Sequence, residues 1–184
     1  MGFHIRKYMK KVFVNGYGSI GSRITQFISG DKDIEVVGVG KYSPDDKVAD
    51  AISRGLHVYV PKEKTGNFKN YKISGTIEDI ISESDLVIDA APGGMGYENK
   101  KTLYEPKNVN AIFQGGEKIG GTESVAELIF NSRVNYEKAF DTNCLIPGLN
   151  LDTHSMELSG LFGSRSKPGK RSLVKLLRIF SFNV

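Results

Sequence analysis

This sequence has very little cysteine, no tryptophan and no long apolar run. Its 184 residues include one cysteine, Cys144, and no tryptophan. A single cysteine excludes an internal disulfide and a cysteine-rich metal site, so we expect no bound metal and a reducing cytoplasm as the compartment. No stretch approaches the roughly 20 consecutive apolar residues of a membrane-spanning helix, and the first residues lack the apolar segment of a signal peptide. These absences favour a soluble globular protein.

Acidic residues are missing from the last part of the chain. None follows Glu157, whereas six basic residues do. Without these six, 19 of the 25 Lys and Arg residues remain against 21 Asp and Glu residues, a net charge of −2 for the rest. The overall net charge of +4 therefore originates in the tail. This charge therefore does not indicate that the rest of the chain binds nucleic acid, and we expect no nucleic-acid partner.

A glycine-rich turn near the start of the chain is the most informative motif. Residues 12–14 form a β-branched and aromatic run typical of a buried strand. Apolar residues then recur at helical spacing, at Ile20, Ile24, Phe27 and Ile28. Between strand and helix lie Gly16, Gly18 and Gly21, a G-x-G-x-x-G pattern.

The spacing of these glycines suits a dinucleotide. Gly16 permits a tight turn, Gly18 lets the backbone approach a pyrophosphate, and Gly21 lets the helix pack close to the strand. Free N–H groups at the start of the helix then face the anion. The motif predicts nucleotide binding, and a glycine-rich turn without a ligand is the alternative.

Strand and helix patterns alternate through the chain to about residue 131. We expect further strands at 34–39, 56–60, 85–89 and 111–113. Helices are expected at 19–29, from a Ser43 cap to about 54, at 77–84, at 96–104 and at 124–131. This alternation indicates an α/β fold with a doubly wound, mostly parallel sheet. Its ligand should lie beyond the carboxyl ends of the strands, where the glycine-rich turn, Lys41, 90–94 and 114–118 converge.

The end of the second expected strand bears on which dinucleotide is bound. Sites selective for NAD usually place an acidic residue there to bind the ribose 2′-OH. This chain has Lys41 and Ser43 instead. A lysine and a hydroxyl suit a 2′-phosphate, so we expect NADP or NAD as the cofactor. A solvated lysine in a turn is the alternative.

Several separated motifs resemble archaeal-type glyceraldehyde-3-phosphate dehydrogenase. They lie at residues 14–21, 36–44, 75–81, 85–89, 111–118 and 135–136. The similarity implies a Rossmann-like NAD(P)-binding domain at 10–140, preceded by a flexible extension at 1–9. The family's cofactor contacts fall here on Ser19, Ile20 and Gly116, and we add the adjoining Gly115 as a candidate.

The resemblance also implies an activity. Members of the family are soluble homotetramers that oxidise glyceraldehyde 3-phosphate with inorganic phosphate to 1,3-bisphosphoglycerate, in glycolysis or gluconeogenesis, while reducing NAD(P). The implied class is an oxidoreductase acting on a small phosphorylated aldehyde. The alternatives are a catalytically inactive nucleotide-binding module, and a peripheral membrane or interaction protein that uses the basic tail.

The resemblance fails after Phe140. Family members continue to a Ser-Cys-Asn-Thr-Thr segment whose cysteine is the nucleophile, and then to a second domain with an acid–base histidine. Here Cys144 arrives too early and lacks those neighbours. It is the candidate catalytic residue, yet no partner base is visible, and His154 matches no family motif. We therefore expect no complete catalytic domain, a chain truncated or altered after about residue 140, and no activity from this chain alone.

Residues 141–184 have the composition of a divergent basic tail. We expect them to be loosely packed, and we expect no strand from them to cover the sheet edge beyond 111–113. Residues 164–171 are rich in Lys, Arg, Gly and Pro. After them, apolar and basic residues fall on opposite faces of a helix, an arrangement that suits an anionic membrane surface or a partner helix. The product of a frameshift that replaced the catalytic half is the interpretation we favour.

Overall fold

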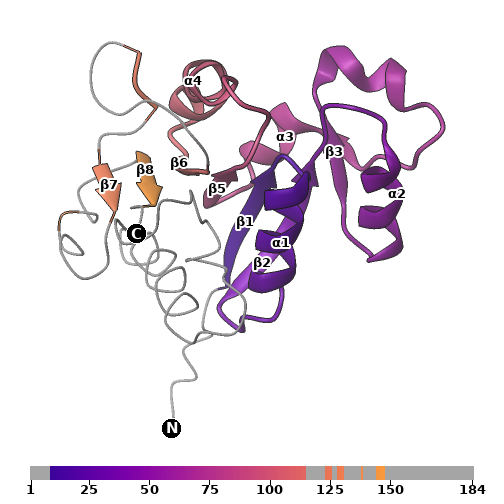
Figure 1. Cartoon of the computed structure of the whole chain (residues 1–184), viewed down its shortest axis with the longest axis horizontal. Coiled ribbons are helices and arrows are strands. Elements are labelled where there is room, and N and C mark those ends of the chain that lie inside the picture. The colour runs from indigo at the N-terminus through magenta and orange to yellow at the C-terminus, as the bar shows by residue number, and fades with distance from the viewer. Residues whose placement is uncertain (1–8, 115–122, 126–127, 131–137, 139–143, 148–184) are drawn as a thin grey trace, which may run out of the picture.

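The computed structural model describes residues 9–114, 123–125, 128–130, 138 and 144–147 (Figure 1). The described strands are β1 (Lys10–Asn15), β2 (Ile34–Gly40), β3 (Val58–Val60), β4 (Gly75–Thr76), β5 (Leu86–Asp89), β6 (Asn110–Phe113), β7 (Leu128–Phe130) and β8 (Cys144–Pro147). The helices are α1 (Ser19–Ile28), α2 (Asp46–Ser53), α3 (Ile77–Ile81) and α4 (Gly96–Asn99). Short helical segments of other types complete the set: 3₁₀ segments η1 (Lys62–Phe68) and η3 (Glu105–Lys107), and a π-helical turn, η2 (Lys100–Tyr104).

The described strands form one sheet in the order β4-β3-β2-β1-β5-β6-β8-β7. Every described pair of neighbouring strands is parallel. From β1 the chain winds outward through β2, β3 and β4, and then returns to β5 on the other side of β1. The direction of winding therefore reverses between β1 and β5, where Asn15 is in register with Asp89. The predicted doubly wound sheet is confirmed.

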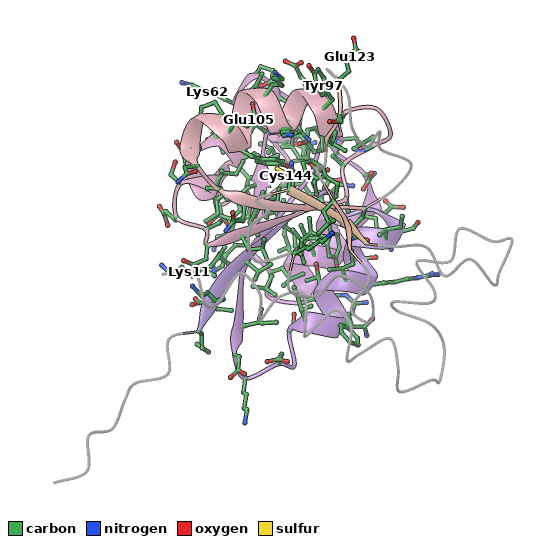
Figure 2. All side chains as sticks on the ribbon, turned by 90° about the vertical axis from the view of Figure 1, so that its left-hand side faces the viewer. Lys11, Lys62, Tyr97, Glu105, Glu123 and Cys144 are labelled. Carbon is green, nitrogen blue, oxygen red and sulfur yellow. The ribbon has the colours of Figure 1, made fainter. Side chains whose placement is uncertain are left out.

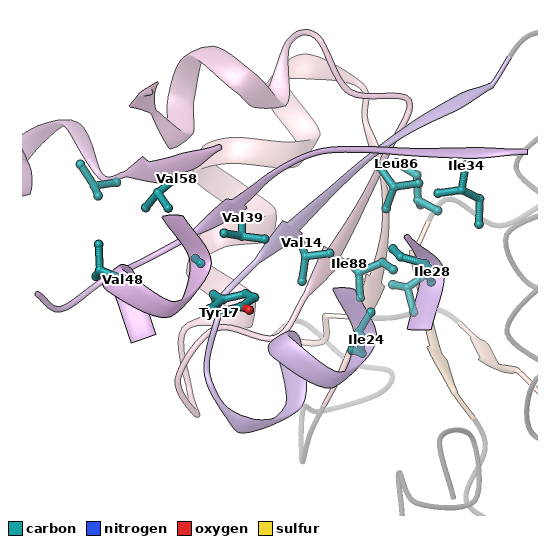
Figure 3. Close-up of a cluster of buried hydrophobic side chains, with 14 of the residues drawn as sticks. Val14, Tyr17, Ile24, Ile28, Ile34, Val39, Val48, Val58, Leu86 and Ile88 are labelled. Atoms are coloured by element: carbon teal, nitrogen blue, oxygen red, sulfur yellow. The ribbon is translucent and has the colours of Figure 1, made fainter. Parts of the chain in front are cut away.

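Successive residues of a strand point to opposite faces of the sheet, and helices cover both faces. Val14 of β1 packs on one face with Ile24 of α1 (Figure 3). Phe13 and Val87 point to the other face, where they pack with Ile81 of α3. Burying each such side chain contributes about 1.5–3 kcal/mol to folding. The two cores hold the carboxyl ends of β1 and β5 side by side.

The start of α2 differs from the prediction. Asp45, rather than Ser43, is the N-cap, and its side chain accepts a hydrogen bond from the Lys47 N–H at 3.0 Å. Both residue types cap well, so the sequence alone did not separate them. The helix predicted at 77–84 is present as α3, which ends at Ile81; Thr76 caps it, since its hydroxyl accepts from the Asp79 N–H at 3.3 Å.

The helix predicted over 124–131 is wrong. Leu128–Phe130 forms β7, which pairs with β8, and residues 123–125 are not helical. A short apolar run such as Leu-Ile-Phe fits a strand or a helix by periodicity, and pairing with a neighbouring strand decides between them. The predicted helix at 96–104 is present as the succession of α4 and the π-helical turn η2.

The expectation of an uncovered sheet edge is also wrong. β8 lies beside β6, with Cys144 in register with Ala111 and Leu145 with Ile112. The sheet therefore continues past residue 140, as far as Pro147. Most of the basic tail, and residues 1–8 of the expected extension, lie outside the described residues. No helix in the described part of the chain is long and apolar enough to cross a membrane.

Candidate functional site

The three glycines of the motif have different surroundings. Gly16 has φ +111°, in the left-handed range that favours glycine, and a Cβ there would lie 2.3 Å from the carbonyl oxygen of Ala90. A Cβ on Gly21 would lie 1.8 Å from the carbonyl oxygen of Gly16. Gly18 is exposed, with no heavy atom within 4 Å of the place of a Cβ. The turn is therefore tight at Gly16, closely packed at Gly21 and open at Gly18.

Two loops meet where the winding of the sheet reverses. The Ala90 N–H donates to the carbonyl oxygen of Asn15 at 2.7 Å, just before Gly16. The glycine-rich turn after β1 and the loop after β5 are thus in direct contact. Ligands of open parallel sheets bind outside the strand ends at such a switch point. The structure brings the expected regions 16–21 and 90–94 together there.

The first turn of α1 presents unpaired N–H groups at the same place. Ser19 and Ile20 open the helix, and both are exposed. The N-cap residue is Gly18, so no side chain caps the helix, and its first turn carries no acidic residue. The first N–H groups of a helix have no intrahelical acceptor and carry partial positive charge. This end of α1 therefore suits an anion.

Tyr17 anchors the glycine-rich turn to the neighbouring elements. Its N–H donates to the carbonyl oxygen of Gly40 at 2.7 Å, and its hydroxyl donates to Asp50 Oδ2 of α2 at 3.1 Å. The ring is 2% exposed. Burial, followed by the hydrogen bond to Asp50, raises the pKa of Tyr17, so its hydroxyl remains a donor at neutral pH. The turn is held against the end of β2.

Lys41 and Ser43 lie on that same side, directly after β2. Lys41 is only 5% exposed, so it is not the solvated lysine of the alternative interpretation. Its Nζ lies 2.7 Å from Asp45 Oδ1 and 3.5 Å from the carbonyl oxygen of Tyr17. The Ser43 hydroxyl donates to Asp45 Oδ2 at 3.0 Å. The structure thus brings Lys41 and Ser43 to the glycine-rich turn, together with an acidic residue that we did not predict.

Comparison with known proteins identifies relatives of this chain. The chain is 44% identical over 137 residues to glyceraldehyde-3-phosphate dehydrogenase of Hyperthermus butylicus, and 47% identical over 136 residues to that of Thermococcus sibiricus. These alignments cover 73% and 70% of this chain and 38% of each relative. Over that stretch it is a homologue of archaeal-type glyceraldehyde-3-phosphate dehydrogenase.

A third relative extends the comparison. Glyceraldehyde-3-phosphate dehydrogenase of Pyrobaculum neutrophilum is 38% identical over 161 residues, which are 83% of this chain and 46% of the relative. The chain thus spans less than half of the length of the curated relatives it matches. No protein-family model matches the sequence. Among solved structures, scyllo-inositol dehydrogenase from Lactobacillus casei matches 59% of this chain and 29% of its own with a TM-score of 0.44, at 12% identity.

A buried polar network lies beneath the two loops. Asn15 Nδ2 donates to the Tyr104 hydroxyl at 2.7 Å, and the Tyr42 hydroxyl donates to Asn15 Oδ1 at 3.0 Å. The Tyr104 hydroxyl donates in turn to Asp89 Oδ2, which also accepts from Asn99 Nδ2 at 2.9 Å. The network connects the ends of β1 and β5 to α4 and the π-helical turn.

Burial determines the electrostatics of this network. Burial raises the pKa of Asp89 above its usual value, although hydrogen bonds from Tyr104, Asn99 and the Ala91 N–H lower it. Burial and the nearby Asp89 likewise raise the pKa of Tyr42 and of Tyr104, so both hydroxyls stay protonated. Sequence analysis missed these residues. The sequence did offer one signal for this network: a polar residue, Asn15 or Asp89, ends each of two buried strands.

Gln114 directly follows β6 at the same edge of the sheet. Its N–H donates to the carbonyl oxygen of Asp89 at 2.7 Å, and the residue is 5% exposed. Neither Nε2 nor Oε1 of this side chain has a hydrogen-bond partner in the described part of the chain. A buried amide without partners costs free energy, which calls for an explanation. The predicted contacts Gly115 and Gly116 lie outside the described residues.

The structure does not bring Cys144 to this edge. Cys144 is the first residue of β8 and pairs with Ala111 of β6, whereas the carboxyl edge is marked by Gln114, three residues after Ala111 and directly after β6. At about 3.3 Å per residue, that separation is about 10 Å. Cys144 is 5% exposed and belongs to the core cluster of Phe113 and Tyr104 (Figure 2). Its position is that of a core side chain rather than of a nucleophile beside the glycine-rich turn.

Proposed function

We propose that this chain carries the nicotinamide-dinucleotide-binding part of a glyceraldehyde-3-phosphate dehydrogenase-like oxidoreductase, with NADP or NAD as the cofactor. The observation that best supports this proposal is the close contact between Gly16 and Ala90 at the switch point. Beside it lie the open Gly18 and the start of α1, which no side chain caps. Homology to archaeal-type glyceraldehyde-3-phosphate dehydrogenases supports the same assignment.

Each described group has a role in this proposal. The backbone at Gly18 allows the pyrophosphate to approach, and the N–H groups of Ser19 and Ile20 bind its oxygens. Lys41 and Ser43 lie on the side of β2, where the adenosine ribose binds in sheets of this topology. The nicotinamide end extends toward β5 and β6, where the buried amide of Gln114 offers the donor and acceptor that a carboxamide pairs with.

We propose the family's reaction, oxidation of glyceraldehyde 3-phosphate with inorganic phosphate, for the assembly to which this part belongs. The aldehyde and the dinucleotide are then the small-molecule partners, the homotetramer the expected assembly and the cytoplasm the compartment. Such chemistry needs an activated thiolate, a base and a bound substrate beside the nicotinamide. In this proposal the described residues bind the dinucleotide beside which those three groups act.

A second candidate function is a nucleotide-binding module without catalysis. The buried place of Cys144, at the start of β8 rather than at the carboxyl edge, favours it for this chain alone. The two candidates make the same prediction for cofactor binding and opposite predictions for aldehyde oxidation by an assembly that contains this chain.

Calorimetric titration with NADP and NAD tests the shared part of the proposal. Gly18→Asp should abolish binding, because it adds bulk and negative charge where the pyrophosphate approaches. Gly66→Asp is the matched control, since Gly66 lies in η1, is exposed and has open space around its Cβ position. Equal affinities of the two variants for NADP would count against the proposed site.

A further inference from the structure

Three donors near the end of β2 converge on one carboxylate. Lys41 Nζ lies 2.7 Å from Asp45 Oδ1 and 2.8 Å from Asp45 Oδ2. The Ser43 hydroxyl donates to Oδ2 at 3.0 Å, and the Lys47 N–H donates to Oδ1 at 3.0 Å. The two side chains that suit a 2′-phosphate are therefore both bound to Asp45. We call Lys41, Ser43 and Asp45 the ribose corner.

The exposures of the two charged partners differ greatly. The Lys41 side chain is 6% exposed, whereas that of Asp45 is 48% exposed. The ammonium also lies 3.5 Å from the carbonyl oxygen of Tyr17, within the glycine-rich turn. Lys41 therefore reaches the turn from the inside, and Asp45 faces solvent beside it. A molecule that approaches from solvent meets the carboxylate first.

The charge of the ribose corner follows from this pair. Although partial burial tends to raise the pKa of Asp45, hydrogen bonds from Lys41 and Ser43 and the charge of Lys41 hold that pKa below its usual value. Asp45 is therefore ionised at neutral pH, and its charge cancels that of Lys41. A phosphate monoester carries about −1.5 to −2 charges at neutral pH. It is attracted by Lys41 and repelled by Asp45 over similar distances.

We propose that Asp45 is a specificity-determining residue, accepting a hydrogen bond from the ribose 2′-OH of NAD and weakening the binding of the 2′-phosphate of NADP. This inference rests on the proposed dinucleotide binding. Asp45 supplies the acidic group that the end of β2 itself lacks, from the N-cap of α2 a few residues later. Lys41 alone favours NADP, and the pair accommodates both dinucleotides.

The capping role of Asp45 can be separated from this role in recognition. Its carboxylate caps α2, so a variant that removed the cap would also destabilise the helix and confuse the result. Asparagine caps as well as aspartate does but carries no charge. Asp45→Asn therefore removes the charge and keeps the cap. Asp46→Asn is the matched control, because it removes the same charge from the next, exposed residue of α2.

The test compares adenosine 2′,5′-bisphosphate with 5′-AMP, which differ only in the 2′-phosphate, by calorimetric titration of the full chain. In Asp45→Asn the preference for the 2′-phosphorylated ligand should rise about tenfold over wild type, because the repulsion is removed while Lys41 remains. In Asp46→Asn it should stay within about twofold of wild type, because solvent and salt screen the more distant charge. Asp45→Ser, a second neutral cap, should behave as Asp45→Asn does.

An unchanged preference in both Asp45 variants, or an equal rise in Asp46→Asn, would overturn the inference. Titration of wild type with NADP and NAD separates this failure from that of the proposed function. If both dinucleotides bind and only the preference fails to move, the inference alone is refuted. If neither binds, the proposed function is refuted, and the inference with it.

Discussion

The Tyr104 hydroxyl is the central group of the buried network beneath the glycine-rich turn. It accepts a hydrogen bond from Asn15 Nδ2 at 2.7 Å and donates one to Asp89 Oδ2. Tyr104→Phe removes only this oxygen, leaving the ring in place against Phe113. The change takes a partner from two buried groups, since Asn15 is 0% and Asp89 3% exposed.

The expected cost follows from those two losses. A buried group that loses its hydrogen-bond partner costs about 1–3 kcal/mol, and Asn99 and the Ala91 N–H still bind Asp89. We therefore expect Tyr104→Phe to lower the free energy of unfolding by about 2–4 kcal/mol. Dinucleotide binding should weaken as well, because Asn15 directly precedes Gly16.

Urea unfolding followed by far-UV circular dichroism measures this cost in a chain that has no tryptophan. Tyr71→Phe is the matched control: it removes the same atom from a half-buried ring that packs against Phe68. It should change stability by no more than about 0.5 kcal/mol. A cost for Tyr104→Phe as small as that of the control would refute the role of the network.

Three further predictions concern other described residues. Because burial raises the pKa of Asp89, the folded chain binds this proton more tightly than the unfolded chain. As pH rises above 3.8, the unfolding free energy of wild type should therefore fall relative to that of Asp89→Asn, and parallel pH dependences of the two would contradict this reasoning. Gln114→Met should stabilise the ligand-free chain by about 1–3 kcal/mol in urea unfolding, since it removes buried polar atoms that have no partner among the described residues, while weakening NADP binding. An aldehyde-dependent NADPH assay on the purified chain should give no product, and Cys144→Ser should leave that result unchanged; product that disappears in Cys144→Ser would restore Cys144 as the nucleophile.

The half of the sheet nearest the chain start was the most predictable from sequence. The glycine spacing and the apolar runs at 12–14 and 85–89 predicted β1, α1 and β5, because their signals are local and periodic. β7 and β8 were not predicted. Both are short, and what identifies them as strands is pairing with each other and with β6, which is set by distant parts of the chain.

The candidate site was predictable only in part, for the same reason. The glycines and Lys41 carry a recognisable pattern, whereas the buried network joins residues as far apart as Asn15 and Tyr104, 89 positions along the chain. Asp45 was within reach of sequence reasoning, since it lies four residues after Lys41. We did not predict its role, because no sequence pattern indicates that the Lys41 ammonium turns back to it.

The location of the dinucleotide is the central claim, and amide chemical-shift mapping of the ¹⁵N-labelled chain tests it most directly. Addition of NADP should shift the amides of residues 16–21, 40–43, 45 and 90–91, which the described structure places at the carboxyl edge around β1, and leave η1 unchanged. Shifts centred on η1, or an absence of shifts at saturating NADP, would contradict the account.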